Sequence, residues 1–199
     1  AFLGWRDLLA LGATSTFFGP IARSDNLWRS LNEDFWRDKV FLPSSARKLT
    51  AAGKHRQAFA DAFTDAKRTW ITAEELCSME WHSRMKAAAG DHYTDTDPWW
   101  TGDAPPRRSQ YNLDGTTTRF VVSEEGQTQN RSGKWRFVRS SCGMTGPLGS
   151  FVRMQHSALG RETPTKVVRR HKNWGWLMDG CWSVSASFPL PPKGEDPTM

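Results

Sequence analysis

The residue types that could carry out chemistry in this chain are few and widely spaced. Its histidines are His55, His82, His92, His156 and His171. His82 and His92 are ten residues apart, so they lack the i, i+4 spacing of a helical zinc site, and no cysteine pair stands near them. The sequence therefore predicts no metal centre and no other cofactor.

The three cysteines, Cys77, Cys142 and Cys181, form no C-x-x-C pair, which favours free thiols in a reducing compartment. Cys142 alone falls in a loop-like context, and it would need a base such as His171 to act as a nucleophile. Cys77 and Cys181 fall in segments that we expect to be packed. Asp95 and Asp97 are explained better as turn formers than as an acid–base pair. The chain also lacks a G-x-S-x-G elbow, a P-loop and a dinucleotide fingerprint. We therefore expect a protein that is not an enzyme.

Two clusters of aromatic residues could contact a partner. The one at residues 169–176 also contains basic residues, and the one at Trp99-Trp100 does not. The chain has 11 Trp, which supply large, rigid apolar surfaces. Arginine and tryptophan together can bind phosphates, stack bases or anchor a protein partner. The alternative for the basic cluster is the end of a strand with a solvated charged face. The alternative for Trp99-Trp100 is an aromatic turn that packs within the protein. The candidate partner-binding residues are Trp99, Trp100, Arg169, Arg170, His171, Lys172, Trp174 and Trp176.

Charge is distributed unevenly along the chain. Residues 1–100 hold 13 Lys/Arg and 13 Asp/Glu, whereas residues 101–199 hold 14 and 8, so the whole net charge of +6 lies in the second half. This half is therefore expected to meet an acidic surface, with a protein favoured over nucleic acid. No stretch reaches the roughly 18 apolar residues of a membrane span, so we expect no transmembrane segment.

The first half of the chain has helical periodicity. Residues 1–42 are predicted to be helical, with a break at Gly19-Pro20. Ser24 is expected to cap a helix that carries Trp28, Leu31 and Phe35 on one stripe. Residues 43–106 read as a spacer that contains one helix over 46–70. The Thr72–Glu75 capping box predicts a second helix, which extends through Ala88 and ends at Gly90.

After residue 106 the pattern changes to short strand-like pieces separated by turn signals. Asp114-Gly115 between two alternating segments predicts a hairpin. Five to seven strands at this spacing predict a small antiparallel barrel or sandwich over residues 107–192, followed by a tail over 193–199. The predicted fold class is therefore α+β. The expected strands are 109–111, 116–122, 134–138, 150–154, 165–170 and 181–188.

The segment Leu27-Trp28-Arg29-Ser30-Leu31, with Asp25-Asn26 before it and Asp34-Phe35-Trp36 after it, resembles the later part of an F-box. The F-box is a helical module that docks on the Skp adaptor of cullin-RING ubiquitin ligases. The opening Leu-Pro and first helix of that module would lie before Ala1. The resemblance implies that the adaptor-docking residues are Leu8, Leu9, Leu11, Phe17, Phe18, Leu27, Trp28 and Leu31.

A second block resembles the Trp-rich region that follows the F-box in certain plant and algal proteins. It includes Glu80-Trp81-His82, Asp97-Pro98-Trp99-Trp100, Gly133-Lys134-Trp135 and Asn173-Trp174-Gly175-Trp176. That region brings no catalytic residues. The similarity implies a domain for substrate recognition or assembly.

Three functions remain open on these observations. The first is a non-enzymatic adaptor of a ubiquitin ligase, bound to a Skp-type protein and a cullin in the cytoplasm or nucleus. The second is an accessory subunit of a large, membrane-associated complex in a plastid or mitochondrion, after removal of a targeting peptide. The third is a small-ligand-binding barrel whose cavity is lined by Trp135, Trp174, Trp176 and Trp182.

Overall fold

The computed structural model describes residues 4–103, 105–123, 126–138, 150–155 and 162–193, with the backbone alone at 121–123 and 126–132. It divides the chain into two compact units. The helical unit comprises residues 1–68 together with 172–174, and the barrel unit comprises 69–171 together with 175–199. The division therefore falls after residue 68, and not at residues 42 and 106 as the sequence suggested.

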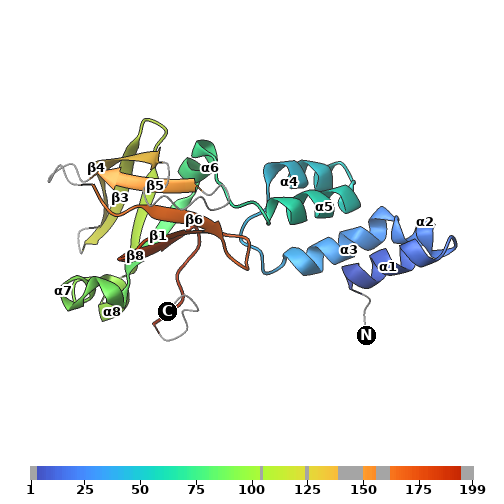
Figure 1. Ribbon diagram of the computed structural model, residues 1–199, viewed down its shortest axis with the longest axis horizontal. Helices are drawn as coiled ribbons and strands as arrows, with labels where there is room; N and C mark the ends of the chain where they lie inside the picture. Colours follow the sequence, from blue (N-terminus) through green and yellow to red (C-terminus); the bar gives the residue numbers. More distant parts are fainter. Residues whose placement is uncertain (1–3, 104, 124–125, 139–149, 156–161, 194–199) are drawn as a thin grey trace. The chain divides into compact units, whose positions relative to one another are not determined.

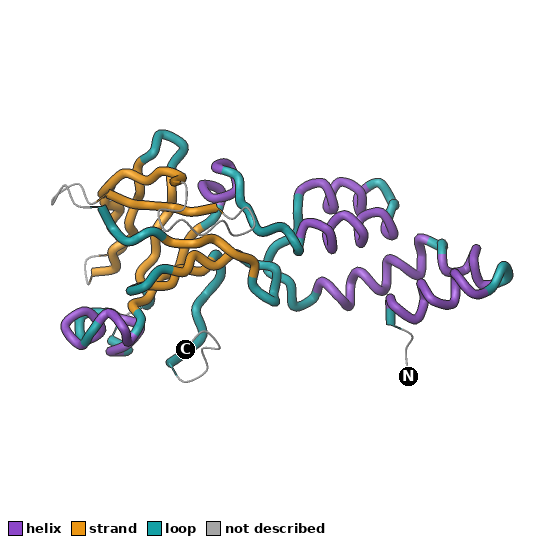
Figure 2. Tube along the Cα trace, in the orientation of Figure 1, coloured by secondary structure: helices purple, strands orange, loops and turns teal. Residues whose placement is uncertain are grey.

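The helical unit contains α1 (Trp5–Thr14), α2 (Phe18–Ala22), α3 (Asp25–Trp36), α4 (Ser44–Ala51) and α5 (His55–Asp65) (Figures 1 and 2). Ser24 takes the predicted N-cap position of α3, although its side chain makes no capping hydrogen bond, and Asp25 lies in the first turn. The predicted break at Gly19-Pro20 is wrong, because Pro20 lies in the first turn of α2, where its missing N–H has no helical partner to lose. The predicted helix over 46–70 is instead two helices, separated at Gly53, which has a φ of +75°.

Trp28 is the centre of the helical core. Its side chain is 1% exposed and packs with Leu8, Ala22 and Phe59. Its indole Nε1 donates a hydrogen bond to the Ala22 carbonyl at 2.8 Å, so the polar atom of the buried ring is paired. Leu31 and Phe35 pack against the same cluster, which confirms the predicted stripe on α3.

The segment 172–174 belongs to the helical unit although it connects two strands of the barrel. Trp174 packs with Ala46 and Ala62 and makes an edge contact with Phe35 at a ring-centroid distance of 5.6 Å. The backbone carbonyl of Asn173 accepts a hydrogen bond from the Val40 amide at 2.9 Å. This short segment therefore contributes both a core side chain and a backbone bond to the unit.

The barrel unit is a closed antiparallel barrel in which each strand pairs with the next and the last returns to the first. This arrangement confirms the α+β class and the barrel alternative. The strands are β1 (Glu80–Met85), β2 (Arg107–Tyr111), β3 (Thr116–Ser123), β4 (Gly126–Val138), β5 (Ser150–Gln155), β6 (Lys166–Arg170), β7 (Trp176–Asp179) and β8 (Ser183–Ala186). The predicted hairpin at Asp114-Gly115 joins β2 to β3, and Gly115 there has a φ of +82°.

The predicted helix over residues 73–90 is wrong beyond its first turns. The capping box forms, with the Thr72 hydroxyl accepting from the Glu75 amide at 3.2 Å, but α6 (Ala73–Ser78) then ends. β1 follows, because pairing with both β2 and β8 closes the barrel and outweighs local helix propensity. The remaining residues form η1 (Ala87–Ala89), α7 (Asp91–Thr94) and α8 (Pro98–Thr101).

One end of the barrel interior is filled by apolar side chains. Trp81, Tyr111 and Trp176 are among its fully buried residues, and Leu76 of α6 packs into the same cluster. Figure 1 shows α6 against the barrel, away from α7 and α8. α6 therefore caps the apolar end, and the other end of the interior is left to different side chains.

Candidate functional site

The inward-facing positions of the barrel change character along the barrel axis. Side chains alternate along a strand, so residues two apart share a face. On β1 the inward series passes from Trp81 to Ser83, and on β2 it passes from Tyr111 to Ser109 and Arg107. Beyond the apolar cluster the interior becomes polar. Its lining there includes Ser83, Arg107, Ser109, Thr117, Arg119, Lys166, Ser183 and Ser185.

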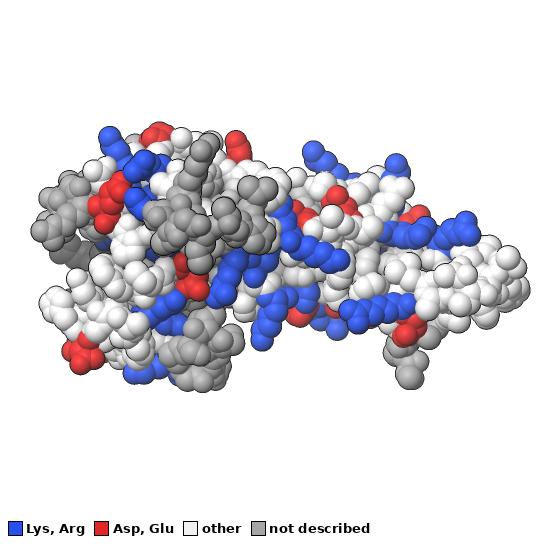
Figure 3. Space-filling model, in the orientation of Figure 1, with Lys and Arg blue, Asp and Glu red and all other residues white. Residues whose placement is uncertain are grey.

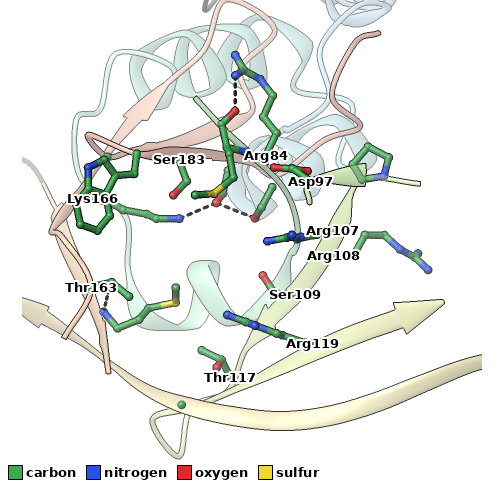
Figure 4. Close-up of a pocket in the computed structure, with 18 of the residues that line it drawn as sticks. Arg84, Asp97, Arg107, Arg108, Ser109, Thr117, Arg119, Thr163, Lys166 and Ser183 are labelled. Carbon is green, nitrogen blue, oxygen red and sulfur yellow. Dashed lines mark hydrogen bonds between the residues drawn. The ribbon is translucent and has the colours of Figure 1, made fainter. Parts of the chain in front are cut away.

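These polar residues line a cavity of about 780 Å³ in the barrel unit. This volume lies within the range of roughly 300–1,000 Å³ that is typical of small-molecule sites. Figure 4 shows Lys166 reaching into the cavity from one wall and Arg119 extending inward from another. We call this space the cationic cavity.

Strand register places the polar and cationic groups next to one another. Ser83 is paired with Arg107 on β2 and with Ser185 on β8. Ser109 on β2 is paired with Arg119 on β3. The Arg107 guanidinium also donates to the Thr96 carbonyl at 2.7 Å, which fixes its position. Two guanidinium groups and three serine hydroxyls thus come from four consecutively paired strands.

Lys166 is the cation that β6 contributes to the cavity. Its side chain is 7% exposed, and its Nζ donates to the Ser185 Oγ at 3.1 Å. The Ser185 hydroxyl lies in turn 2.9 Å from that of Ser83, so the amine is connected to a short chain of hydroxyls. Gly180 makes room for the lysine stem, because a Cβ there would lie 3.1 Å from Lys166 Cγ.

The cations influence one another as well as the space between them. Burial lowers the pKa of the Lys166 amine to about 8, and the nearby Arg119 charge acts in the same direction, against Asp179. Burial followed by the Arg107 charge lowers the pKa of Arg119. A bound anion would relieve this repulsion, because it supplies the opposite charge in a region of low dielectric.

The carboxylates along the cavity are already engaged. Asp97 is fully buried and accepts from the backbone amides of Met85 and Trp99. Glu162 is bound by Arg136 at 2.6 Å and by Arg153 at 2.9 Å. Among the described lining residues, the remaining polar groups are therefore mainly cations and hydroxyls, and they lie beside apolar side chains such as Phe120 and Met154.

Aromatic and apolar side chains stand at the mouth of the cavity. Tyr93 and Trp182 are about half exposed and stack with a ring-centroid distance of 6.4 Å and an interplanar angle of 15°. Both line the cavity, together with Pro105 and Cys181. A ligand with an anionic end and an apolar body would meet cations inside and rings at the entrance.

The structure separates most of the predicted partner-binding residues. Trp176 is fully buried under the Arg170 guanidinium, which lies 3.7 Å from its ring, and Trp174 belongs to the core of the helical unit. Both rings were predicted to bind a partner, but they are packed in hydrophobic cores and are not available at the surface. Arg169 remains exposed and is paired with Asp179 at 3.0 Å, and Lys172 is exposed.

The remaining members of the prediction are packed within the barrel unit. His171 lies against the Phe188 ring, with centroids 5.1 Å apart. Trp99 is 6% exposed and covers the Arg84 guanidinium at 4.4 Å, while its Nε1 donates to the Pro191 carbonyl. Trp100 is half-buried and donates to the Met85 carbonyl at 2.8 Å. The Trp99-Trp100 pair therefore fastens α8 to β1, which is the packed alternative weighed above.

The predicted adaptor-docking residues divide into a buried and an exposed set. Leu8 and Trp28 are core residues, and Leu11 and Leu31 are half-buried. Leu9, Phe17, Phe18 and Leu27 are 40–73% exposed. Residues 8–22 contain no charged side chain, and Ile21 within them is also exposed. In Figure 3 the corresponding end of the helical unit is uncharged.

The structure describes two of the three cysteines and both Asp95 and Asp97. Cys77 is buried in the barrel core, as expected, but Cys181 is exposed, because it lies in the turn before β8 and not within a strand. Cys142 and His156 lie outside the described residues. Within the described part of the chain no group of three or more His, Cys, Asp or Glu could hold a metal ion. Asp97 caps α8, in keeping with its expected role in a turn.

Of the cavity tryptophans proposed from sequence, only Trp182 lines the cavity. Trp135 and Trp176 belong to the apolar end of the barrel. The residues that sequence reasoning missed are Arg107, Arg119 and Lys166. Lys166 shares its phase of the alternation with the apolar Val168, whereas Arg107 and Arg119 belong to a polar phase, as in Arg107-x-Ser109 and Thr117-x-Arg119. That phase normally faces solvent, so the signal identifies a cavity only when the barrel is known to be closed.

Comparisons with known proteins give no relative: a scan against protein-family models, a search of curated proteins and a search of solved structures each returned no significant match. Among the described helices, none has both the length and the apolar character needed to cross a membrane.

Proposed function

We propose that this chain is a non-enzymatic binding protein whose barrel captures small organic anions. The observation that carries the proposal is the convergence of Arg107, Arg119 and Lys166 on one cavity of about 780 Å³. Of the three, Lys166 is buried, whereas Arg107 and Arg119 are exposed. A buried cation is costly unless it finds a counter-charge. Because the lining carboxylates Asp97 and Glu162 are engaged with other groups, an entering anion would add a counter-charge to Lys166.

The test compares two ligands of nearly the same shape, benzoate and neutral benzyl alcohol, by calorimetric titration of the full chain. We expect benzoate to bind and benzyl alcohol to bind at least about tenfold more weakly, because a hydrogen bond to a charged group contributes roughly 1.5–3 kcal/mol. Added salt should weaken benzoate binding much more than benzyl alcohol binding.

Two variants locate the site. Arg119→Gln removes an inward cation and should weaken benzoate binding at least about tenfold. Arg169→Gln is the matched control, because Arg169 is an exposed arginine on β6 and faces away from the cavity. Equal losses in both variants, or equal affinity for the two ligands, would contradict the proposal. A larger loss of benzoate affinity in Arg169→Gln would instead indicate that the outer basic cluster around Arg169 binds the anion.

A second function, protein docking through the helical unit, is favoured by the exposed apolar side chains of Leu9, Phe17, Phe18 and Leu27. Contiguous exposed apolar surface is unusual on a soluble protein and marks interaction sites. Together with the F-box-like sequence, this surface supports an adaptor that docks on a Skp-type protein while the barrel holds its ligand.

Docking can be tested with a purified Skp-type adaptor and the full chain in a calorimetric titration. Phe17→Ser should abolish binding without loss of stability, since the ring is 73% exposed, and Leu113→Ser on the barrel unit is a control of similar exposure. Absence of binding by the unmodified chain would contradict the ligase reading. Recovery of one large assembly without adaptor or cullin, after purification of the tagged protein from its own cells, would favour the accessory-subunit alternative.

A further inference from the structure

Lys166 differs from an ordinary lysine in both its surroundings and its reach. It lies on the inward face of β6, its stem fits beside Gly180, and its amine ends in the cationic cavity, as Figure 4 shows. Lys134 of β4 is a useful contrast, because it is exposed. The Lys166 amine is therefore shielded from bulk water and open to whatever occupies the cavity.

The same surroundings favour the neutral, nucleophilic form of the amine. Burial and then the Arg119 charge oppose a positive charge there and lower the pKa of the amine, whereas the Asp179 charge acts in the opposite direction. With a pKa of about 8, about a quarter of Lys166 amines are neutral at pH 7.5, against about one in a thousand for a lysine at 10.5. Lysines that react with carbonyl compounds are activated in this way, by desolvation and by a neighbouring cation.

We propose that Lys166 captures aldehydes that carry an anionic group, by forming a reversible imine inside the cationic cavity. The proposal rests on the function proposed above, because Arg107 and Arg119 hold the anionic group while the carbonyl carbon meets Nζ. The ligand class is thus narrowed from organic anions to anionic aldehydes.

The reaction needs no co-reactant. The lone pair of the neutral Lys166 Nζ forms a bond to the carbonyl carbon, and the π electrons of the C=O bond move to oxygen. One amine proton passes to that oxygen, which gives a carbinolamine. The nitrogen lone pair then forms the C=N bond while the C–O bond breaks, which gives a protonated imine and hydroxide. The remaining N–H proton passes to the hydroxide, which departs as water, and the neutral imine is left. The net change is amine plus aldehyde to imine plus water, without oxidation or reduction.

The hydroxyl chain suits these proton movements. Ser185 Oγ is 3.1 Å from Nζ, and Ser83 Oγ is 2.9 Å further along. A hydroxyl both donates and accepts, so Ser185 can take the amine proton and return one to the departing oxygen. Ser185 is thus placed as a proton relay beside the reacting atom.

The experiment treats the full chain with 4-formylbenzoate at pH 7.5, reduces any imine with borohydride, and maps the modified lysines by mass spectrometry of peptides. We expect Lys166 to be modified at least about tenfold faster than the exposed Lys134. The non-aldehyde analogue 4-(hydroxymethyl)benzoate should compete, and benzaldehyde, which lacks the carboxylate, should react at least about tenfold more slowly.

Two variants complete the test. Lys166→Arg keeps a cation but has no amine that can become neutral, so it should lose the modification. Lys134→Arg should leave the modification of Lys166 unchanged, and circular dichroism verifies the fold of both variants. In the chain without substitutions, competition by 4-(hydroxymethyl)benzoate shows whether the reaction occurs in the anion site, and this result does not depend on the folding of a variant.

The outcomes separate the two proposals. Binding of 4-(hydroxymethyl)benzoate without preferential modification of Lys166 would overturn the imine and leave anion binding intact. Absence of binding by either carboxylate would overturn both. Modification spread evenly over exposed lysines would count against the imine whatever the binding result.

Discussion

Lys166 should make the barrel less stable at neutral pH, and removing its charge should stabilise it. Lowering the pKa from 10.5 to about 8 means that the folded state disfavours the protonated amine by roughly 3 kcal/mol. In Lys166→Met this term disappears, while the hydrogen bond to Ser185 is lost at a cost of about 1 kcal/mol. We therefore expect the variant to raise the free energy of unfolding by roughly 2 kcal/mol at pH 7.

The sign of the effect sets its pH dependence. Below pH 8 the folded and unfolded chains both hold the proton, so the whole penalty applies. Between pH 8 and 10.5 the unfolded chain binds more protons than the folded chain, and the free energy of unfolding rises with pH. The destabilisation that Lys166 causes should therefore decrease by roughly 2 kcal/mol between pH 7 and 9.5.

The assay is urea unfolding followed by tryptophan fluorescence, with the unmodified chain and Lys166→Met measured at pH 7 and pH 9.5. Burial raises the pKa values of Tyr111 and Cys77, so these groups also titrate above neutrality, and only the difference between the two proteins isolates Lys166. The difference should shrink from roughly 2 kcal/mol to near zero. A variant that is less stable at both pH values, with no change in the difference, would refute the reasoning.

Three further substitutions test the folds of the barrel unit and the helical unit. Gly133→Ala should destabilise the barrel by roughly 1–3 kcal/mol, because φ is +92° and a Cβ would lie 2.7 Å from the Gln155 carbonyl oxygen; thermal unfolding measures this, and an unchanged midpoint would count against it. Thr72→Ala should cost about 1 kcal/mol through loss of the α6 cap, with Thr72→Ser as the conservative control in the same urea assay. Trp28→Ala should cost roughly 3–5 kcal/mol and melt the helical unit, seen as lost helical circular dichroism; retention of that signal would show that the ring is not the centre of the core.

Helix α3 and the β2–β3 hairpin were predictable because local signals and tertiary structure agree there. The stripe of Trp28, Leu31 and Phe35 matches the face that packs, and Asp114-Gly115 supplies the turn geometry that the hairpin needs. The prediction for β1 was wrong because its sequence fits a helix equally well. Its strand conformation depends on pairing with its two neighbours, β2 and β8. β7 was missed because all but one of its four residues are buried, so it shows no alternation.

The cationic cavity could not be predicted from the sequence for a related reason. Alternation shows that Arg107, Ser109 and Tyr111 share one face of β2, but it does not say whether that face is inside or outside. A polar face of a strand normally lies towards solvent, whereas here polar and apolar residues follow one another along the same inward face. Only closure of the sheet, which depends on pairing between β1 and β8 about a hundred residues apart, turns that face inward.

Closure of the sheet also determines how another molecule can be recognised by this barrel. In an open sheet the edge strand offers unpaired N–H and C=O groups, to which an extended peptide can add as a further strand. Here β8 pairs with β1, so the strand order has no edge. A peptide or protein partner of this unit must therefore be read by side chains, either on the outer wall or at the mouth. Strand exchange between copies, a common route to aggregation in β proteins, would first require the β1–β8 ladder to open.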